Sequence, residues 1–96
     1  SLSRLAIEER DAILARDVTG DARLKSESVH EISAQSVICA PLRVREMLLG
    51  LIHLYSTDLE HSLEPEDLDF TLAVADQFAL ALEKLHQREE LAVGLA

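Results

Sequence analysis

The last third of the chain carries its clearest periodic pattern. Apolar side chains recur there every three or four residues in one stripe, made of Leu68, Leu72, Ala75, Ala79, Leu82 and Leu85. This spacing predicts a single helix that runs to about residue 91 and packs on a sheet. A second apolar strip beside the stripe implies a partner helix. The candidate residues for a helix or dimer interface are Leu72, Ala75, Ala79, Leu82 and Leu85.

The start of this helix is marked by residues with defined capping roles. Glu64 is the expected N-cap, Pro65 the first helical residue, and Asp67 the residue that completes a capping box. Beyond the reach of the sheet the helix becomes polar, so residues 84–96 are expected to begin a helical linker.

Three strands are predicted upstream of the helix, after a short helix near the N-terminus. Residues 12–18, 36–42 and 47–55 are rich in β-branched and other apolar residues and are bounded by turn-forming residues. The third strand is apolar on both faces, which predicts a central position with a cover on each face. The fold class is therefore α+β, with an antiparallel sheet of about three strands covered by the long C-terminal helix.

Composition and charge exclude several classes of protein. The chain has 96 residues, 48% of them hydrophobic, as expected for one globular domain. Its net charge of −9 disfavours direct binding to nucleic acids and to anionic membrane surfaces. No apolar run approaches the length of a membrane span. The single cysteine allows no intrachain disulfide, and a reducing, cytoplasmic location fits it best.

An ordered set of four segments resembles GAF domains, which are PAS-related. Residues 36–42 (SVICAPL) and 49–56 (LGLIHLYS) are similar to the paired inner strands of that family. Residues 64–83, from an acidic start into AVADQFALALE, resemble its terminal signalling helix. Residues 13–28 match as well, so that the resemblance covers nearly the whole chain.

The resemblance implies a fold, a partner and a role. Residues 1–96 would form a single truncated GAF-like domain that lacks the family's N-terminal helix and first strand pair. The third strand would then have an open edge, which favours a homodimer. The implied role is a regulatory module of a bacterial signalling or transcription-regulatory protein, which binds a small molecule and controls a covalently linked output domain. A ligand-free dimerisation scaffold is the alternative, and a small redox enzyme is less well supported.

Four residues are candidates for a ligand pocket. Asp17, Arg23 and Ser28 flank the polar segment that closes over the cavity in the family. Turn capping is the competing explanation for Asp17, which lies near a glycine. His53 is the one titratable group in the third strand, and it either lines a pocket or is a hydrogen-bonded core histidine.

Catalytic, metal and cofactor sites are not expected. Cys39 lies among apolar strand residues and is expected to be a small buried hydrophobe rather than a redox or attachment thiol. The histidines lack the spacing of a metal site. Residues 63–68 also depart from the signature of cyclic-nucleotide-binding relatives, because leucines replace its Phe and Glu. No enzymatic activity, metal or cofactor is therefore predicted.

Overall fold

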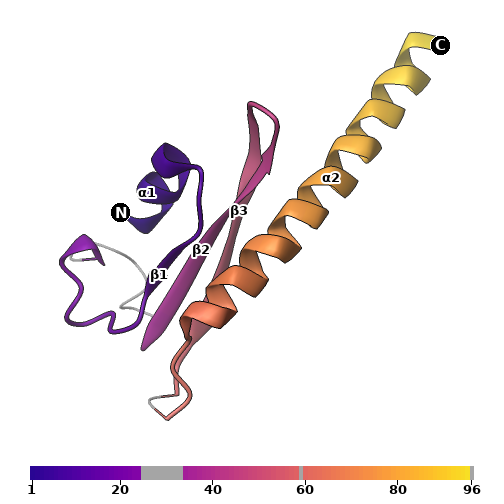
Figure 1. Ribbon diagram of the computed structural model, residues 1–96. Coiled ribbons are helices and arrows are strands. Elements are labelled where there is room, and N and C mark those ends of the chain that lie inside the picture. Colours follow the sequence, from indigo (N-terminus) through magenta and orange to yellow (C-terminus); the bar gives the residue numbers. More distant parts are fainter. Residues whose placement is uncertain (25–33, 59, 96) are drawn as a thin grey trace.

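Two helices sandwich a three-stranded antiparallel sheet (Figure 1). The computed structural model describes residues 1–24, 34–58 and 60–95, with side chains in the last helix as far as Glu89. The α+β class predicted from the sequence is confirmed. The elements in chain order are α1 (Leu2–Glu9), β1 (Ile13–Ala15), the 3-10 turn η1 (Ala22–Leu24), β2 (Ser36–Val44), β3 (Met47–Ser56) and α2 (Pro65–Leu95).

β2 is the central strand and the best-buried element. Its continuous apolar sequence suits a strand that is covered on both faces. Val37 and Cys39 point toward α1 and share a core cluster with Leu2 of that helix. Ala40 and Leu42 belong to a second cluster, on the face that α2 covers. The sheet therefore separates two small cores.

β3 is an edge strand among the described residues: its predicted central position is wrong, and the open edge that the resemblance implies is observed. The strand order is β1-β2-β3, and β3 pairs with β2 alone among the described residues. Leu49, Leu54 and Tyr55 keep 39%, 40% and 40% of their surface exposed. Because α2 packs mainly over β2, it leaves the outer side of β3 uncovered. The apolar side chains of β3 are therefore partly exposed among the described residues.

The β2–β3 hairpin is tighter than predicted. The ladder continues to the pair Val44–Met47, with an irregularity between Leu42 and Arg43, so the turn itself consists of Arg45 and Glu46. Arg45 has a φ of 52°, in the left-handed region that few non-glycine residues occupy.

The Asp67 half of the predicted capping box is present at the start of α2, whereas the Glu64 side chain bonds to Arg16. The backbone N–H of Glu64 donates to Asp67 Oδ2 at 2.8 Å, and the N–H of Asp67 donates to the Glu64 carbonyl at 2.9 Å. Ala75 and Ala79 are fully buried against β2, which lets the helix approach the sheet closely. The helix has 31 residues, and its last turns extend past the sheet (Figure 1).

The Asp67→Ala substitution should destabilise the protein by about 0.5–2 kcal/mol, because it removes the carboxylate that accepts from the Glu64 N–H at the start of α2. Asp69→Ala is the matched control, since it removes an acidic side chain two residues later that makes no described hydrogen bond to the cap. Urea denaturation of both variants tests the prediction, and equal losses in the two would contradict it.

Candidate functional site

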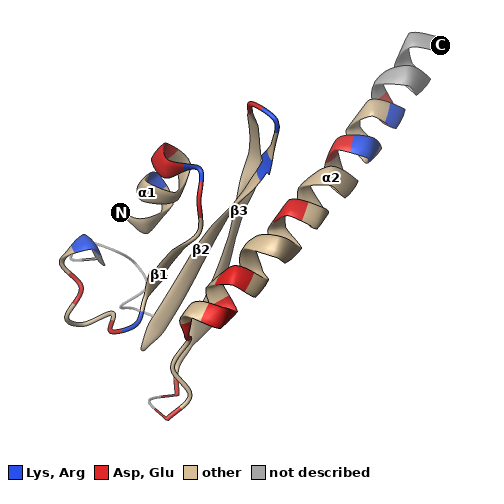
Figure 2. Ribbon diagram, viewed as in Figure 1, with Lys and Arg blue, Asp and Glu red and all other residues tan. Residues whose placement is uncertain are grey.

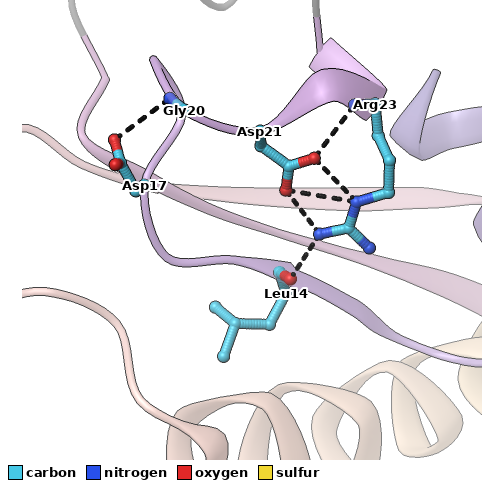
Figure 3. Close-up of polar contacts among 5 residues, drawn as sticks. All are labelled: Leu14, Asp17, Gly20, Asp21 and Arg23. Atoms are coloured by element: carbon cyan, nitrogen blue, oxygen red, sulfur yellow. Dashed lines mark hydrogen bonds and ion pairs between the residues drawn. The ribbon is translucent and has the colours of Figure 1, made fainter.

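Asp17 caps the turn that follows β1. Its Oδ1 accepts hydrogen bonds from Thr19 Oγ1 at 2.8 Å and from the Gly20 N–H at 3.3 Å. A Cβ at residue 20 would lie 2.8 Å from Asp17 Oδ2, so any larger residue there would require the Asp17 carboxylate to shift. Figure 3 shows the Asp17 carboxylate turned toward Gly20. The turn-capping explanation therefore accounts for Asp17.

Arg23 connects the same segment to β1 of the sheet by a hydrogen bond. Its Nε donates to Asp21 Oδ1 at 2.9 Å, and one terminal nitrogen donates to the Leu14 carbonyl of β1 at 3.0 Å (Figure 3). The pKa of Asp21 lies below its ordinary value, chiefly because its carboxylate accepts hydrogen bonds from the Arg23 side chain. The Arg23 guanidinium thus stabilises the turn after β1 by hydrogen bonds to Asp21 and to the Leu14 carbonyl.

Arg23→Gln should raise the pKa of Asp21 toward its ordinary value of 3.8, as measured by NMR titration of the carboxyl carbon. A lowered pKa in the folded state stabilises the protein above pH 3.8, and this contribution is lost as the pH falls through the folded-state pKa. The variant should therefore lose less stability than the wild type below pH 4. Arg16→Gln, which breaks the separate pair with Glu64, should leave the Asp21 titration unchanged; a shift there would refute the assignment.

His53 links β3 to α1. It lies opposite Cys39 in the ladder, and its Nε2 is 3.1 Å from Ser3 Oγ of α1 and 3.5 Å from Cys39 Sγ. Its ring stacks along the strand with that of Tyr55, with 6.2 Å between centroids. His53 is exposed, so it is hydrogen-bonded but is not a core histidine. Cys39 is fully buried.

The four predicted pocket residues are not seen to form one pocket. Asp17 and Arg23 bond within their own turn, His53 bonds to α1, and Ser28 lies outside the described residues. A ligand site built from them stays a prediction.

Apolar grooves follow β3 instead. One, of about 210 Å³, lies between β3 and the first half of α2 and is lined by Ile52, Leu54, Phe70, Thr71 and Val74. A second, of about 290 Å³, is lined by Leu49, Leu82, Leu85, His86 and Glu89. A third, of about 390 Å³, is lined by Ile7, Leu48, Leu49, Gly50 and Leu51. The second apolar strip predicted on the helix includes Val74 of this surface, but the exposed Phe70 and Phe78 were not predicted.

The predicted interface stripe of α2 is largely occupied within the chain. Ala75 and Ala79 are fully buried, and Leu72 and Leu82 pack against the same cluster on the sheet. Leu85 is 54% exposed at the second groove. The helix-to-sheet packing of the stripe is thus observed, and a dimer contact made by these residues stays a prediction.

Arg43 connects the two helices that cover opposite faces of the sheet. From β2 its guanidinium donates to Asp76 of α2, with Nε 3.0 Å from Oδ1 and the second terminal nitrogen 3.3 Å from Oδ2. The other terminal nitrogen donates to the carbonyl of Arg10, the residue that ends α1. The hydrogen bond to Asp76 raises the pKa of Arg43 above its already high value, so the charge is permanent.

A second ion pair joins the hairpin turn to α2. Arg45 donates to Glu83 Oε1, which also accepts from Gln87 Nε2 at 3.2 Å. Glu83 is 8% exposed, and its Oε2 is buried without a hydrogen-bond partner. Arg10 donates to the carbonyls of Arg45 and Glu46, so α1 also contacts this turn. Hydrogen bonds from Arg10 and Arg45 therefore join α1, the hairpin turn and α2 at one end of the sheet. Figure 2 shows the basic residues at the end of α1 and in the hairpin turn.

The described residues contain neither a cluster of metal-ligating side chains nor a membrane-spanning helix. No group of three or more His, Cys, Asp or Glu side chains among them is placed to hold a metal ion. None of the helices in that part of the chain combines the length and the apolar character that a membrane crossing requires.

Comparisons with known proteins place the chain in a family. The sequence model of the GAF domain matches residues 3–82. A solved structure of a type II free methionine-R-sulfoxide reductase from Thermoplasma acidophilum has a similar fold, with a TM-score of 0.69 and 24% identity over 88% of this chain. The chain spans 57% of that protein's length. No curated protein matches. The match over residues 3–82 shows that this chain belongs to the GAF domain family.

Proposed function

We propose that this GAF domain is a regulatory module of a bacterial signal-transduction or transcription-regulatory protein. A small molecule or partner bound on the α1 face would shift α2, and α2 would pass the change to a covalently linked output domain. The observation that carries the proposal is the Arg43 guanidinium, which bonds to the end of α1 and to Asp76 of α2. Family membership supports the regulatory role.

Because one guanidinium, that of Arg43, bonds to both α1 and α2, the interaction energies on the two faces of the sheet depend on each other. A change in the position of the Arg10 carbonyl alters the best position of the guanidinium, and with it the charge-assisted bonds to Asp76. A ligand controls α2 only if it binds two arrangements of the helix with different affinities. α1 therefore need not contact α2 for binding on its face to bias that helix.

The length of α2 suits an output element. The helix packs on the sheet as far as Leu82, and Glu83 holds the hairpin turn. Residues 86–95 follow these contacts and at 1.5 Å per residue extend about 15 Å further. A rotation or tilt at Asp76 would be carried along this segment as a rigid rod.

Two alternatives differ in what they require. A ligand-free scaffold needs only a stable fold and a partner surface. A redox enzyme needs a reactive thiol, yet Cys39 is fully buried and is the only cysteine in the chain. The reductase activity belongs to the structural neighbour by its name, and the likeness at 24% identity supports the fold only.

Thermal unfolding in the presence of candidate ligands separates these roles. Free methionine, methionine-R-sulfoxide and a cyclic nucleotide are suitable first probes. A sensor should melt several degrees higher with one class of probe, because a ligand at 100 times its Kd adds about 2.7 kcal/mol. No shift with any broader panel would favour the scaffold. Reduction of methionine-R-sulfoxide with dithiothreitol, lost in Cys39→Ser, would instead establish the enzyme.

A further inference from the structure

Two strained backbone positions meet at the end of the sheet where α1 ends (Figure 1). Arg10, which ends α1, has a φ of 54°, and Arg45, in the β2–β3 turn, has a φ of 52°. No other described residue apart from glycine has a positive φ. Left-handed backbone is costly for a side chain as large as that of arginine, and it persists only where surrounding contacts enforce it.

The contacts that enforce this backbone run in both directions between α1 and the hairpin. Arg10 Nη1 donates to the carbonyl of Glu46 at 3.3 Å, and its Nη2 donates to the carbonyl of Arg45 at 2.5 Å. Arg43, which precedes the turn in β2, donates in return to the carbonyl of Arg10. A displacement of the end of α1 therefore breaks the bonds that keep Arg45 in the left-handed conformation.

The side chain of Arg45 binds the helix on the opposite face of the sheet. It donates to Oε1 of Glu83, which also accepts from Gln87 Nε2 at 3.2 Å. Glu83 directly follows Leu82, the last residue of α2 in the core cluster beneath that helix. The turn thus connects the end of α1 to the part of α2 where its core packing ends. We call the bonds from Arg10 to the turn and from Arg45 to Glu83 the turn contact.

The turn contact is held against two opposing costs. Glu83 is 8% exposed, and no described residue bonds to its Oε2. A buried carboxylate oxygen without a partner has lost its hydration and gained no bond in return. Release of Glu83 into water would restore the hydration, and release of Arg45 would remove the strain in the turn. Both costs oppose the attraction between the two charges, as a contact that opens and closes requires.

We propose that the turn contact is a releasable connection through which α1 controls the second half of α2. With α1 in place, Arg10 keeps the turn in its left-handed conformation and Arg45 holds Glu83. When the end of α1 moves, the turn relaxes, the ion pair opens, and the helix beyond Leu82 is free to change its angle to the sheet. The proposal deepens the proposed function, and it rests on that function for the role of α2 as the output element.

The turn contact acts on a part of α2 that is easier to move than the part around Asp76. Ala75 and Ala79 flank Asp76 and are fully buried against β2, so the helix there cannot leave the sheet without opening the core. Glu83 lies about 10 Å further along the helix axis, where Leu85 is already 54% exposed. A change of helix angle at Glu83 therefore disrupts less apolar packing than the same change at Asp76.

Distances between spin labels, measured by electron paramagnetic resonance, test the release. Met47→Cys and Arg88→Cys in a Cys39→Ala background place labels at two exposed positions, one beside the turn and one on α2 beyond the ion pair. Dilution with unlabelled protein restricts the measurement to distances within one chain. We expect a narrow distribution with Glu83 intact and an added longer component in Glu83→Gln. Glu66→Gln, which removes an exposed carboxylate in the first turn of α2, should leave the distribution narrow. An unchanged distribution in Glu83→Gln would overturn the proposal.

Substitution of Arg10 tests control by α1, because no described hydrogen bond joins its side chain to α2. Arg10→Asn tolerates the left-handed backbone but removes both bonds to the turn, so it should add the same longer component. Arg4→Asn, at an exposed arginine of the same helix, should not. Release in Glu83→Gln without release in Arg10→Asn would overturn the proposal, since the ion pair would then be structural only. If circular dichroism shows that Arg10→Asn does not fold, Arg10→Lys keeps the charge without the forked geometry and should give a smaller longer component.

The label experiments need no ligand, so they are independent of the melting experiment that tests the proposed function. A ligand-induced melting shift together with unchanged label distances in both variants would overturn the turn contact alone. Release of α2 in both variants without any melting shift would support the turn contact and count against the sensory role.

Discussion

Ile38→Ala is expected to lower the free energy of unfolding by about 2–5 kcal/mol. Ile38 lies in the middle of β2, is fully buried, and faces Leu14 and Leu54 in the neighbouring strands. Its shortening leaves a cavity that the sheet cannot close without moving both neighbours. A domain of 96 residues has a total stability of about 5–14 kcal/mol, so the loss should be visible as partial unfolding at 37 °C.

The same substitution at Ile7 is the control for this prediction. Ile7 lies on α1 and is 47% exposed, so Ile7→Ala removes less buried surface and should cost about 1 kcal/mol or less. Urea denaturation of both variants at one protein concentration makes the comparison. Similar midpoints for the two would show that β2 is not the centre of the core.

Arg45→Asn should destabilise the protein by about 2–3 kcal/mol, which is large for a residue in a hairpin turn. The reason lies in its partner, because Glu83 is 8% exposed and one of its carboxylate oxygens already lacks a partner. Asparagine tolerates the left-handed backbone at residue 45, where φ is 52°. The variant therefore reports on the lost ion pair rather than on backbone strain.

The double variant Arg45→Asn, Glu83→Leu distinguishes two causes of destabilisation: an unpaired buried carboxylate at Glu83, and the loss of its ion pair with Arg45. Removing the buried carboxylate should recover most of the stability, since replacement of both partners avoids an unpaired buried charge. Denaturant midpoints of the wild type, both single variants and the double variant complete the cycle. A double variant less stable than Arg45→Asn alone would mean that the first substitution does not leave a costly unpaired charge at Glu83.

Local sequence signals predicted the elements well. The capping residues Glu64 and Asp67 fix the start of α2 through bonds between neighbours, and Ala75 and Ala79 mark its buried face. The position of β3 depends instead on strand order, which is set by contacts between distant segments. A strand that is apolar on both faces fits either a covered centre or an unprotected edge, and the structure shows the edge.

The candidate site was less predictable for a related reason. Arg43 and Asp76 are separated by 33 residues, and no spacing rule connects them. Asp17 had two explanations in the sequence, and its bonds to Thr19 and Gly20 are those of a turn cap. The exposure of Phe70 and Phe78 on α2 was not predicted, because apolar residues at helical spacing give no sign of which helix face packs on the sheet.

Hydrogen exchange in Asp76→Asn tests most directly whether the two faces of the sheet are coupled. Asp76 lies on α2, and only Arg43 connects it, among the bonds described, to the end of α1. The substitution should weaken the hydrogen bonds between residue 76 and the Arg43 guanidinium. It should therefore lower the hydrogen-exchange protection of amides 7–10 in the last turn of α1. Asp69→Asn, which removes the same charge elsewhere on α2, should leave that turn unchanged. Reduced protection around residue 76 with no change at the end of α1 would contradict the account.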